Sequence, residues 1–288
     1  MKPNFLVIGA PKSATTSLCD KLKQHPEVFF SAPKETFFFC YDHVYEKKGW
    51  PWFESLFEGA EGFKAIGEGS TINANLGTYP NALPRIVEHV PDAKIIYIVR
   101  EPIRRIESYW VELHSQGTIT VPFNRAVRED PQLLDTSLYW KQISAYREHF
   151  SDDRILTLFF EDFKRDAAGE LRRCFAFLEI DPEVHIEDAQ TPKHVTQGRN
   201  RDLWLTNMMR HRLPGFYAIR DAVPKPIRDG AKRLLKRPID TGFEWEPGVL
   251  AWTLDQLRED SAAFLDYAGK PADFWDMSPY EQRLRQAG

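Results

Sequence analysis

The sequence has few cysteines and no long apolar run, and both shortages exclude classes of protein. Its three cysteines, Cys19, Cys40 and Cys174, have neither the number of a disulfide framework nor the spacing of a CxxC metal site. No apolar stretch approaches the roughly 18 residues of a transmembrane helix. The residues before the first apolar run lack the pattern of a signal peptide, so we expect none. We therefore expect a cytoplasmic protein without a membrane span, with Cys19 and Cys174 as buried small apolar residues.

Excess positive charge, linkers and repeats are also missing. The net charge of −4 at neutral pH excludes a globally basic nucleic-acid binder. No Pro-, Gly- or Ser-rich tract and no internal repeat divides the chain, so we predict a single domain over residues 1–288. Hydrophobic residues make up 42% of the sequence, which is enough for a large core.

The most informative stretch lies near the amino terminus, where an apolar run meets a polar turn. Residues 5–8 are typical of a buried strand, and Gly9 ends it. The turn that follows reads Ala-Pro-Lys-Ser-Ala-Thr-Thr-Ser, and an amphipathic helical segment covers residues 18–23. A strand, a loop and a helix in this order direct free backbone N–H groups and the positive helix end at an anion. The stretch predicts a phosphate-binding loop.

This loop departs from the Walker A motif of ATP-binding proteins. Counted from Gly9, the motif requires glycine at position 14 and lysine at position 15, where this chain has Ala14 and Thr15. The lysine of the loop, Lys12, stands three positions earlier. We therefore expect Lys12 to contact a different part of the ligand from the β- and γ-phosphates of ATP.

A second strand–turn–helix pattern covers residues 94–110. Residues 95–99 form an apolar, β-branched run that is typical of a buried parallel strand, and Arg100 follows directly. Pro102 suits the first turn of a helix, which carries Ser108 about two turns inward, near the same end of the sheet as Arg100. A guanidinium and a hydroxyl together suit a phosphate monoester.

The two motifs together resemble those of sulfotransferases that use 3′-phosphoadenosine 5′-phosphosulfate (PAPS). Residues 9–17 resemble the 5′-phosphosulfate loop of that family, and the segment with Arg100 and Ser108 resembles its 3′-phosphate motif. The resemblance is good over residues 4–110 and looser up to residue 200. It implies an α/β fold with a P-loop-like phosphosulfate-binding loop, a PAPS-binding core over residues 4–200 and a helical elaboration over residues 201–288.

The resemblance also implies which residues bind PAPS and its product, 3′-phosphoadenosine 5′-phosphate (PAP). The expected ligands are Pro11, Lys12, Ser13, Ala14, Thr15, Thr16, Ser17, Arg100, Ser108 and Arg199. Arg199 lies in a polar, basic stretch, residues 191–201, that resembles the loop closing over the PAPS phosphates; a solvated connection is the alternative. No His/Cys/Asp cluster of metal-binding type is visible, so we expect no metal.

Sulfuryl transfer needs one group to neutralise the leaving phosphate and another to take the proton of the acceptor. Lys12 is the candidate for the first role. Glu35 is the candidate base, because it follows a short strand in an aromatic loop where burial would raise its pKa. In the heparan-sulfate branch the expected base is a glutamate in a similar Glu-x-His-Phe-Phe stretch, whose histidine is replaced here by Phe37. The alternative for Glu35 is an ion pair with Lys34 or Lys64.

His114 is a second catalytic candidate, because the helix after Arg100 could turn it toward the same cleft; a structural role is the alternative. The basic segment 225–237 is interpreted as a solvated helix face, with a docking surface for an acidic acceptor as the second possibility. Neither feature resembles a nucleic-acid site.

The remaining apolar patterns alternate between strands and helices. Strands are predicted at residues 28–30, 65–67 and 155–159, and helices at about 79–89, 102–116, 139–150 and 170–179. A last helical pattern runs from Leu250 to Ala268 and is expected to serve packing only. Such alternation implies a parallel sheet with helices on both faces and ligands at the carboxyl ends of the strands.

The sequence therefore predicts a sulfotransferase that moves a sulfuryl group from PAPS to a hydroxyl of a glycan or small-molecule acceptor, with an amine as the less favoured acceptor. A P-loop small-molecule kinase is the alternative enzyme, and it conflicts with the missing Walker residues. A nucleotide-binding module without catalysis is the alternative of a different class, and it would make Lys12 and Glu35 dispensable.

Overall fold

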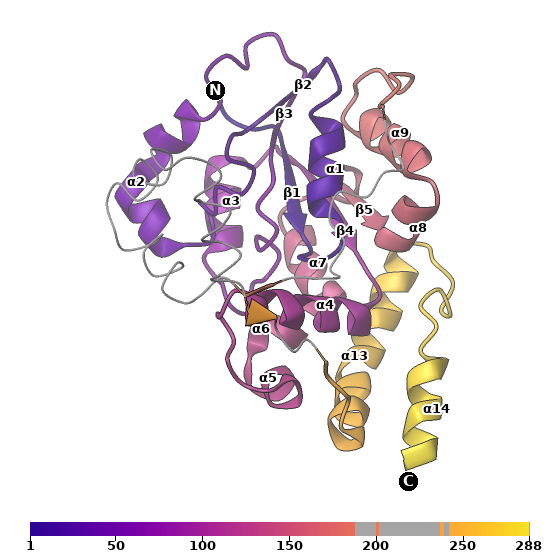
Figure 1. Cartoon of the computed structure of the whole chain (residues 1–288). Coiled ribbons are helices and arrows are strands. Elements are labelled where there is room, and N and C mark those ends of the chain that lie inside the picture. The colour runs from indigo at the N-terminus through magenta and orange to yellow at the C-terminus, as the bar shows by residue number, and fades with distance from the viewer. Residues whose placement is uncertain (188–199, 202–236, 239–241, 288) are drawn as a thin grey trace.

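The structure is a computed structural model that describes residues 1–187, 200–201, 237–238 and 242–287 (Figure 1). Its centre is a five-stranded sheet in the order β2–β3–β1–β4–β5, and every neighbouring pair is parallel. The strands are β1 (Phe5–Gly9), β2 (Val28–Phe30), β3 (Ala65–Glu68), β4 (Lys94–Val99) and β5 (Ile155–Phe159). The predicted α/β class with a central parallel sheet is confirmed.

Helices cover both faces of this sheet. One face carries α1 (Thr15–Leu22), α8 (Phe160–Arg165) and α9 (Ala167–Phe177). The other face carries α2 (Asp42–Ser55), α3 (Ala82–His89), α7 (Tyr139–Arg147) and α13 (Pro247–Tyr267). In Figure 1, α2 and α3 accordingly lie to the left of the strands, and α9 lies at the upper right.

Alternation along the strands explains these two layers. Successive side chains of a strand point to opposite faces of the sheet. Phe5 and Val7 of β1 therefore pack beneath α1 and α9, whereas Leu6 and Ile8 pack with α3 and α7. All four side chains are fully buried, which is why the sequence shows a continuous apolar run here.

A third apolar cluster lies beside the sheet, around α4 (Pro102–Ser115). It joins α4 to the start of α13 and to α5 (Phe123–Glu129), through residues such as Trp110, Phe123 and Leu250. The fully buried Arg105 of α4 donates from Nε to Ser137 Oγ at 2.6 Å. This fixes α4 against the η1 turn (Asp135–Ser137), so the helix that carries Ser108 is held firmly.

The smaller elements connect these layers. They are α6 (Pro131–Leu134), η2 (Asp152–Arg154), α14 (Ser278–Ala287) and the antiparallel pair β6 (Asn200–Arg201) and β7 (Arg237–Pro238). Tyr280 of α14 donates its hydroxyl proton to Glu101 at 3.2 Å, and Glu101 caps the first turn of α4. The carboxyl-terminal helix thereby contacts the start of the helix with the second motif.

The expected elements are present at the predicted places, and the structure adds helices that the sequence pattern did not suggest. α2 is the largest of these, and its apolar periodicity is interrupted by Gly49, whose φ of 71° is not helical, and by Pro51. All three cysteines are free and buried, Cys19 in α1 and Cys174 in α9, as predicted. Within the part of the chain that the structure describes, no helix is sufficiently long and apolar to cross a bilayer.

The strand order creates a topological switch point between β1 and β4. The chain leaves β1 toward β2 on one side and leaves β4 toward β5 on the other side, so β1 and β4 flank the topological switch point. Ligands of open α/β sheets bind in the crevice outside the carboxyl ends of the strands at such a point. The loop after Gly9 and the residue after Val99 are therefore the first places to examine.

A half-buried carboxylate that links α13 to α7 provides a test of the packing. Asp260 accepts hydrogen bonds from the backbone N–H groups of Trp140 at 3.0 Å and Lys141 at 2.8 Å. Burial raises its pKa to about 6, although these hydrogen bonds oppose the shift. The folded protein therefore binds this proton more tightly than the unfolded chain does. Protonation of Asp260 thus adds to the free energy of unfolding at low pH, and this contribution is lost as the pH rises through about 6.

We predict that Asp260→Asn gains unfolding free energy relative to the wild type as the pH rises from 4 to 7, because the amide never carries the buried charge. Urea unfolding of both proteins at several pH values measures this. Asp255→Asn, an exposed change on the same helix, is the control and should show no such trend. A stability difference between Asp260→Asn and wild type that is constant over this range would contradict the prediction.

Candidate functional site

The loop after β1 is tightly packed where it leaves the sheet. A Cβ atom on Gly9 would lie 3.0 Å from the carbonyl oxygen of Thr71 and 3.1 Å from the ring of Tyr97, so only glycine fits without a shift. Ala10 N–H donates to the carbonyl of Ile98 in β4 at 2.6 Å. These contacts tie the loop to both neighbouring strands.

The middle of the loop has an unusual backbone conformation. Lys12 and Ala14 have φ values of 70° and 69°, in the left-handed region that residues other than glycine rarely adopt. Ser13 N–H donates to the carbonyl of Ala10 at 3.2 Å. Such strain persists where the surroundings fix it, and it is common at ligand-binding loops.

Two features of the loop suit an anionic ligand. α1 begins at Thr15 directly after Ala14, and no side chain caps its first turn. The hydroxyl of Ser13 is buried and has no hydrogen-bond partner among the described residues. Free N–H groups at a helix start together with an unsatisfied buried hydroxyl form donors that a phosphate would satisfy. The residues predicted to bind the 5′-phosphosulfate therefore fit such a group.

The cations of the two motifs lie at the same junction. Arg100 follows β4 and donates from its guanidinium to the carbonyl of Lys12 at 3.4 Å, while its guanidinium carbon lies 4.7 Å from the ring centre of Phe160. Lys12 Nζ lies 2.8 Å from Oε2 of Glu112 on α4. Both motifs therefore meet at the switch point, at the carboxyl ends of β1 and β4 where the sequence predicted ligands to bind.

Ser108 lies half-buried in the second turn of α4, as expected. Pro102 occupies the start of that helix, and Glu101 accepts hydrogen bonds from the N–H groups of Ile103 at 2.8 Å and Arg104 at 2.9 Å. The capped start and the buried Arg105 fix the orientation of α4 relative to Arg100. Binding of a 3′-phosphate by Arg100 and Ser108 stays a prediction.

The sequence predicted that Glu35 is buried in the aromatic loop, and the structure shows that it is not. About a third of its side chain, 34%, is exposed, and Oε1 lies 3.0 Å from Lys34 Nζ. The same oxygen accepts a hydrogen bond from Thr71 Oγ1 at 3.2 Å. The ion pair with Lys34 that the sequence left as an alternative is thus present, whereas Lys64 pairs with Glu27. The neighbouring aromatic rings belong to the core, where Phe38 and Phe39 are fully buried.

The buried carboxylate of this region belongs to Glu68, at the end of β3. It is fully buried and accepts hydrogen bonds from the hydroxyls of Ser70 and Thr36, the latter at 2.9 Å. Burial raises its pKa, and these hydrogen bonds oppose the shift. Ser70 Oγ also accepts the N–H of Phe37 at 3.0 Å. Glu68 and Ser70 therefore fix Thr36 and Phe37, the two residues directly after Glu35, to the end of β3.

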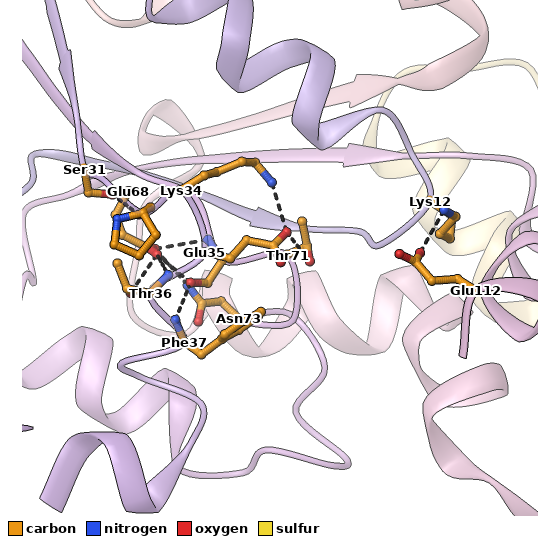
Figure 2. Close-up of polar contacts among 12 residues, drawn as sticks. Lys12, Ser31, Lys34, Glu35, Thr36, Phe37, Glu68, Thr71, Asn73 and Glu112 are labelled. Atoms are coloured by element: carbon orange, nitrogen blue, oxygen red, sulfur yellow. Dashed lines mark hydrogen bonds and ion pairs between the residues drawn. The ribbon is translucent and has the colours of Figure 1, made fainter. Parts of the chain in front are cut away.

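Figure 2 shows these side chains as two groups. Lys12 and Glu112 form one pair, and Lys34, Glu35 and Thr71 form the other, with Thr71 on the side toward Lys12. All of them follow the carboxyl ends of strands or lie on α4. Lys12 and Glu35, the two residues expected to act in the chemical step, therefore lie in separate groups, and their catalytic roles stay predictions.

His114 is occupied by packing contacts. It follows Glu112 by two positions, which turns it to nearly the opposite side of α4. Its ring stacks on Trp110 at 4.7 Å, and Nδ1 donates to the carbonyl of Ile119 at 3.0 Å. These contacts favour the structural alternative, because they turn the ring toward the third apolar cluster, and the catalytic role of His114 stays a prediction without support from them.

Arg199 lies outside the described residues, as does the basic segment 225–237 up to residue 236. In the described part of the chain, no group of three or more His, Cys, Asp or Glu residues has the arrangement of a metal site.

Sequence reasoning missed Glu112 and assigned no catalytic role to Glu68 or Thr71. Glu112 had one available signal, since it stands four positions after Ser108 and therefore on the same helix face. Glu68 and Thr71 follow a predicted strand, and their contacts with residues 35–37 depend on the neighbouring positions of β2 and β3. Those contacts become visible only in the folded sheet.

Comparison with known proteins shows what part of the chain is similar to sulfotransferases. Residues 61–183 match the model of the sulfotransferase family. A membrane-associated sulfotransferase, kil1, of Dictyostelium discoideum is 29% identical over 157 residues, which cover 51% of this chain and 32% of that protein. Heparan sulfate glucosamine 3-O-sulfotransferase 3A1 of Mus musculus is 29% identical over 188 residues, which cover 61% of this chain and 45% of that protein. The chain thus spans about a third to a half of the length of these relatives.

Solved structures agree on the fold. A sulfotransferase from Alicyclobacillus acidocaldarius superposes with a TM-score of 0.67 at 21% identity, and the match covers 98% of this chain and 99% of the other. The chain therefore has the sulfotransferase fold. The fold that the resemblance implied is confirmed, and the match to the family model covers residues 61–183.

The Glu68 network yields a stability prediction. We expect Glu68→Ala to lower the free energy of unfolding by about 3 kcal/mol, because it leaves the buried hydroxyls of Thr36 and Ser70 without their acceptor. Urea unfolding measures the loss. Glu61→Ala, at an exposed position before β3, is the control and should change stability by less than about 0.5 kcal/mol. Equal stability of the two variants would show that the network contributes nothing.

Proposed function

We propose that this chain, which has the sulfotransferase fold and matches the sulfotransferase family over residues 61–183, transfers a sulfuryl group from PAPS to an acceptor hydroxyl. The observation that carries the proposal is the meeting of Lys12 and Arg100 at the switch point between β1 and β4. A 5′-phosphosulfate and a 3′-phosphate require two cationic positions, and the two motifs supply them.

Each half of the nucleotide site has its own donors. The buried Ser13 hydroxyl and the uncapped start of α1 are proposed to bind the 5′ end of the nucleotide, with Lys12 beside them. Arg100 and Ser108 are proposed to bind the 3′-phosphate, which distinguishes PAPS from ATP. When bound, PAPS supplies the sulfuryl group and a phosphate as the leaving group.

The chemical step is assigned to Lys12 and Glu35. The Lys12 ammonium is proposed to neutralise the charge that grows on the leaving phosphate. Glu35 is proposed to take the proton of the acceptor, and its partly exposed carboxylate leaves it accessible to an acceptor. Lys34 and Thr71 orient it through an ion pair of 3.0 Å and a hydrogen bond of 3.2 Å, both to Oε1. No step requires a metal.

A sugar hydroxyl is the favoured acceptor. Several relatives are named for carbohydrate acceptors, among them the heparan sulfate enzyme above and carbohydrate sulfotransferase 15 of Mus musculus, which is 25% identical over 266 residues. The loop near Glu35 carries Phe37 where the heparan-sulfate pattern has histidine, so the polar groups around the acceptor differ from that pattern.

The nucleotide preference provides the first test. Calorimetry should show that PAP binds far more tightly than AMP, because only PAP offers a 3′-phosphate to Arg100. Arg100→Ala should weaken PAP binding about 30- to 150-fold, the loss of a charge-assisted contact of about 2–3 kcal/mol. Arg125→Ala removes an exposed guanidinium from α5 and should leave PAP affinity unchanged. Equal affinity of the wild type for PAP and AMP would contradict the proposal, and tight binding of Mg-ATP would favour the kinase.

The chemical step provides the second test, by single-turnover sulfuryl transfer in excess chelator. Glu35→Gln should keep PAP affinity and lower the rate by about 10²- to 10⁴-fold, the usual contribution of a general base. Lys12→Ala should lower the rate much more than it lowers PAP affinity. A Glu35→Gln enzyme with wild-type turnover would place the base elsewhere. Activity that disappears with chelator and returns with magnesium would favour the kinase instead.

A further inference from the structure

The ion pair between Lys12 and Glu112 has no place in the proposed chemistry, although it holds the lysine on which that chemistry depends. The two atoms, Lys12 Nζ and Glu112 Oε2, lie 2.8 Å apart. The side chains are only 13% and 26% exposed, so water screens this pair less than it screens a surface pair. Figure 2 shows the pair apart from the cluster around Glu35.

Glu112 is well placed to act on the nucleotide site. It stands four positions after Ser108, one turn further along the same face of α4. Its other oxygen, Oε1, accepts a hydrogen bond from Gln116 Nε2 at 3.3 Å. The carboxylate therefore lies on the helix that is proposed to hold the 3′-phosphate and reaches the loop that is proposed to hold the 5′ end.

The backbone of Lys12 leaves its ammonium little freedom. The residue has a φ of 70°, and its carbonyl accepts a hydrogen bond from Arg100 at 3.4 Å. A lysine whose backbone is fixed on one side and whose ammonium is paired on the other is oriented before any ligand binds. An arriving anion must therefore compete with Glu112 for this ammonium.

We propose that Glu112 is the counter-ion of Lys12 in the absence of nucleotide, and that the 5′-phosphate group of the nucleotide replaces it when the nucleotide binds. Glu112 is thus a positioning residue that acts through Lys12. This inference rests on the proposed function, because it requires a nucleotide with an anionic 5′ end in the loop after β1.

The exchange of Glu112 for the nucleotide phosphate changes how much Lys12 contributes to nucleotide affinity and how much to the rate. Nucleotide binding breaks one ion pair as it forms another, so Lys12 adds little net affinity for the bound ground state. Charge that grows on the leaving phosphate attracts Lys12 more strongly than Glu112 does, so the gain appears in the transition state. The nearby carboxylate also repels the product and favours its release.

The test compares two nucleotides that differ only at the 5′ end. Calorimetry is run with PAP and with adenosine 3′-phosphate, on the wild type and on Glu112→Gln. We expect Glu112→Gln to bind PAP about 5- to 10-fold more tightly, a gain of about 1–1.4 kcal/mol. The affinity for adenosine 3′-phosphate should not change, because that nucleotide has no 5′-phosphate to compete for Lys12.

A double-mutant cycle shows whether the effect passes through Lys12. Lys12→Ala alone should alter PAP affinity little, whereas the same change in the Glu112→Gln background should abolish the gain. Glu129→Gln removes the same charge from an exposed pair on α5 and should leave both affinities unchanged. Glu112→Ala is measured as well, and thermal unfolding of each variant reports its folded fraction.

The outcomes separate the two proposals. If the wild type binds PAP and neither Glu112 variant binds PAP more tightly than the wild type does, the counter-ion role is overturned. The sulfotransferase proposal would still stand in that case. A gain that persists without Lys12, or that appears equally with adenosine 3′-phosphate, would overturn it too. A wild type that binds no PAP would overturn the proposed function itself.

Discussion

The site depends on one close contact, the crossing of Thr71 over Gly9 at the end of β1. The position that a Cβ atom would take on Gly9 lies 3.0 Å from the Thr71 carbonyl and 3.1 Å from the ring of Tyr97. Because no side chain separates them, the loop after β1, the segment after β3 and strand β4 share one junction. The hydroxyl of Thr71 donates a hydrogen bond to Glu35, and Arg100 directly follows the last residue of β4. A larger residue at position 9 would separate all three parts together.

The two lysines of the site are each paired with a carboxylate. Lys12 is matched by Glu112, and Lys34 by Glu35. This agrees with the overall charge of −4 and explains why composition alone gave no sign of an anion site. A paired cation binds an anion by exchange, so selectivity depends on how well the ligand replaces the carboxylate. Geometry, more than net charge, therefore determines what binds.

The parts of the site that lie within one short segment were predictable from the sequence. The loop from Gly9, the strand before Arg100 and the helix opened by Pro102 each have a local pattern, and the structure confirms all three elements. Contacts between segments were not predictable in this way. The pairing of Lys12 with Glu112 joins residues 100 positions apart in the chain, and only the adjacency of β1 and β4 brings them together. Helix α2 was missed because Gly49 and Pro51 interrupt its apolar period.

The contrast between Glu35 and Glu68 shows why burial is a poor guide to the base. Burial was the reason to expect a raised pKa at Glu35, yet the buried carboxylate is Glu68, whose pKa is raised by that burial. Its oxygens already accept hydrogen bonds from Thr36 and Ser70, so an acceptor hydroxyl cannot approach them. A base must reach the proton that it removes. Glu35, the proposed base, differs from Glu68 in this respect. Glu68 fixes the neighbouring Thr36, while the carboxylate of Glu35 stays partly exposed beside Lys34.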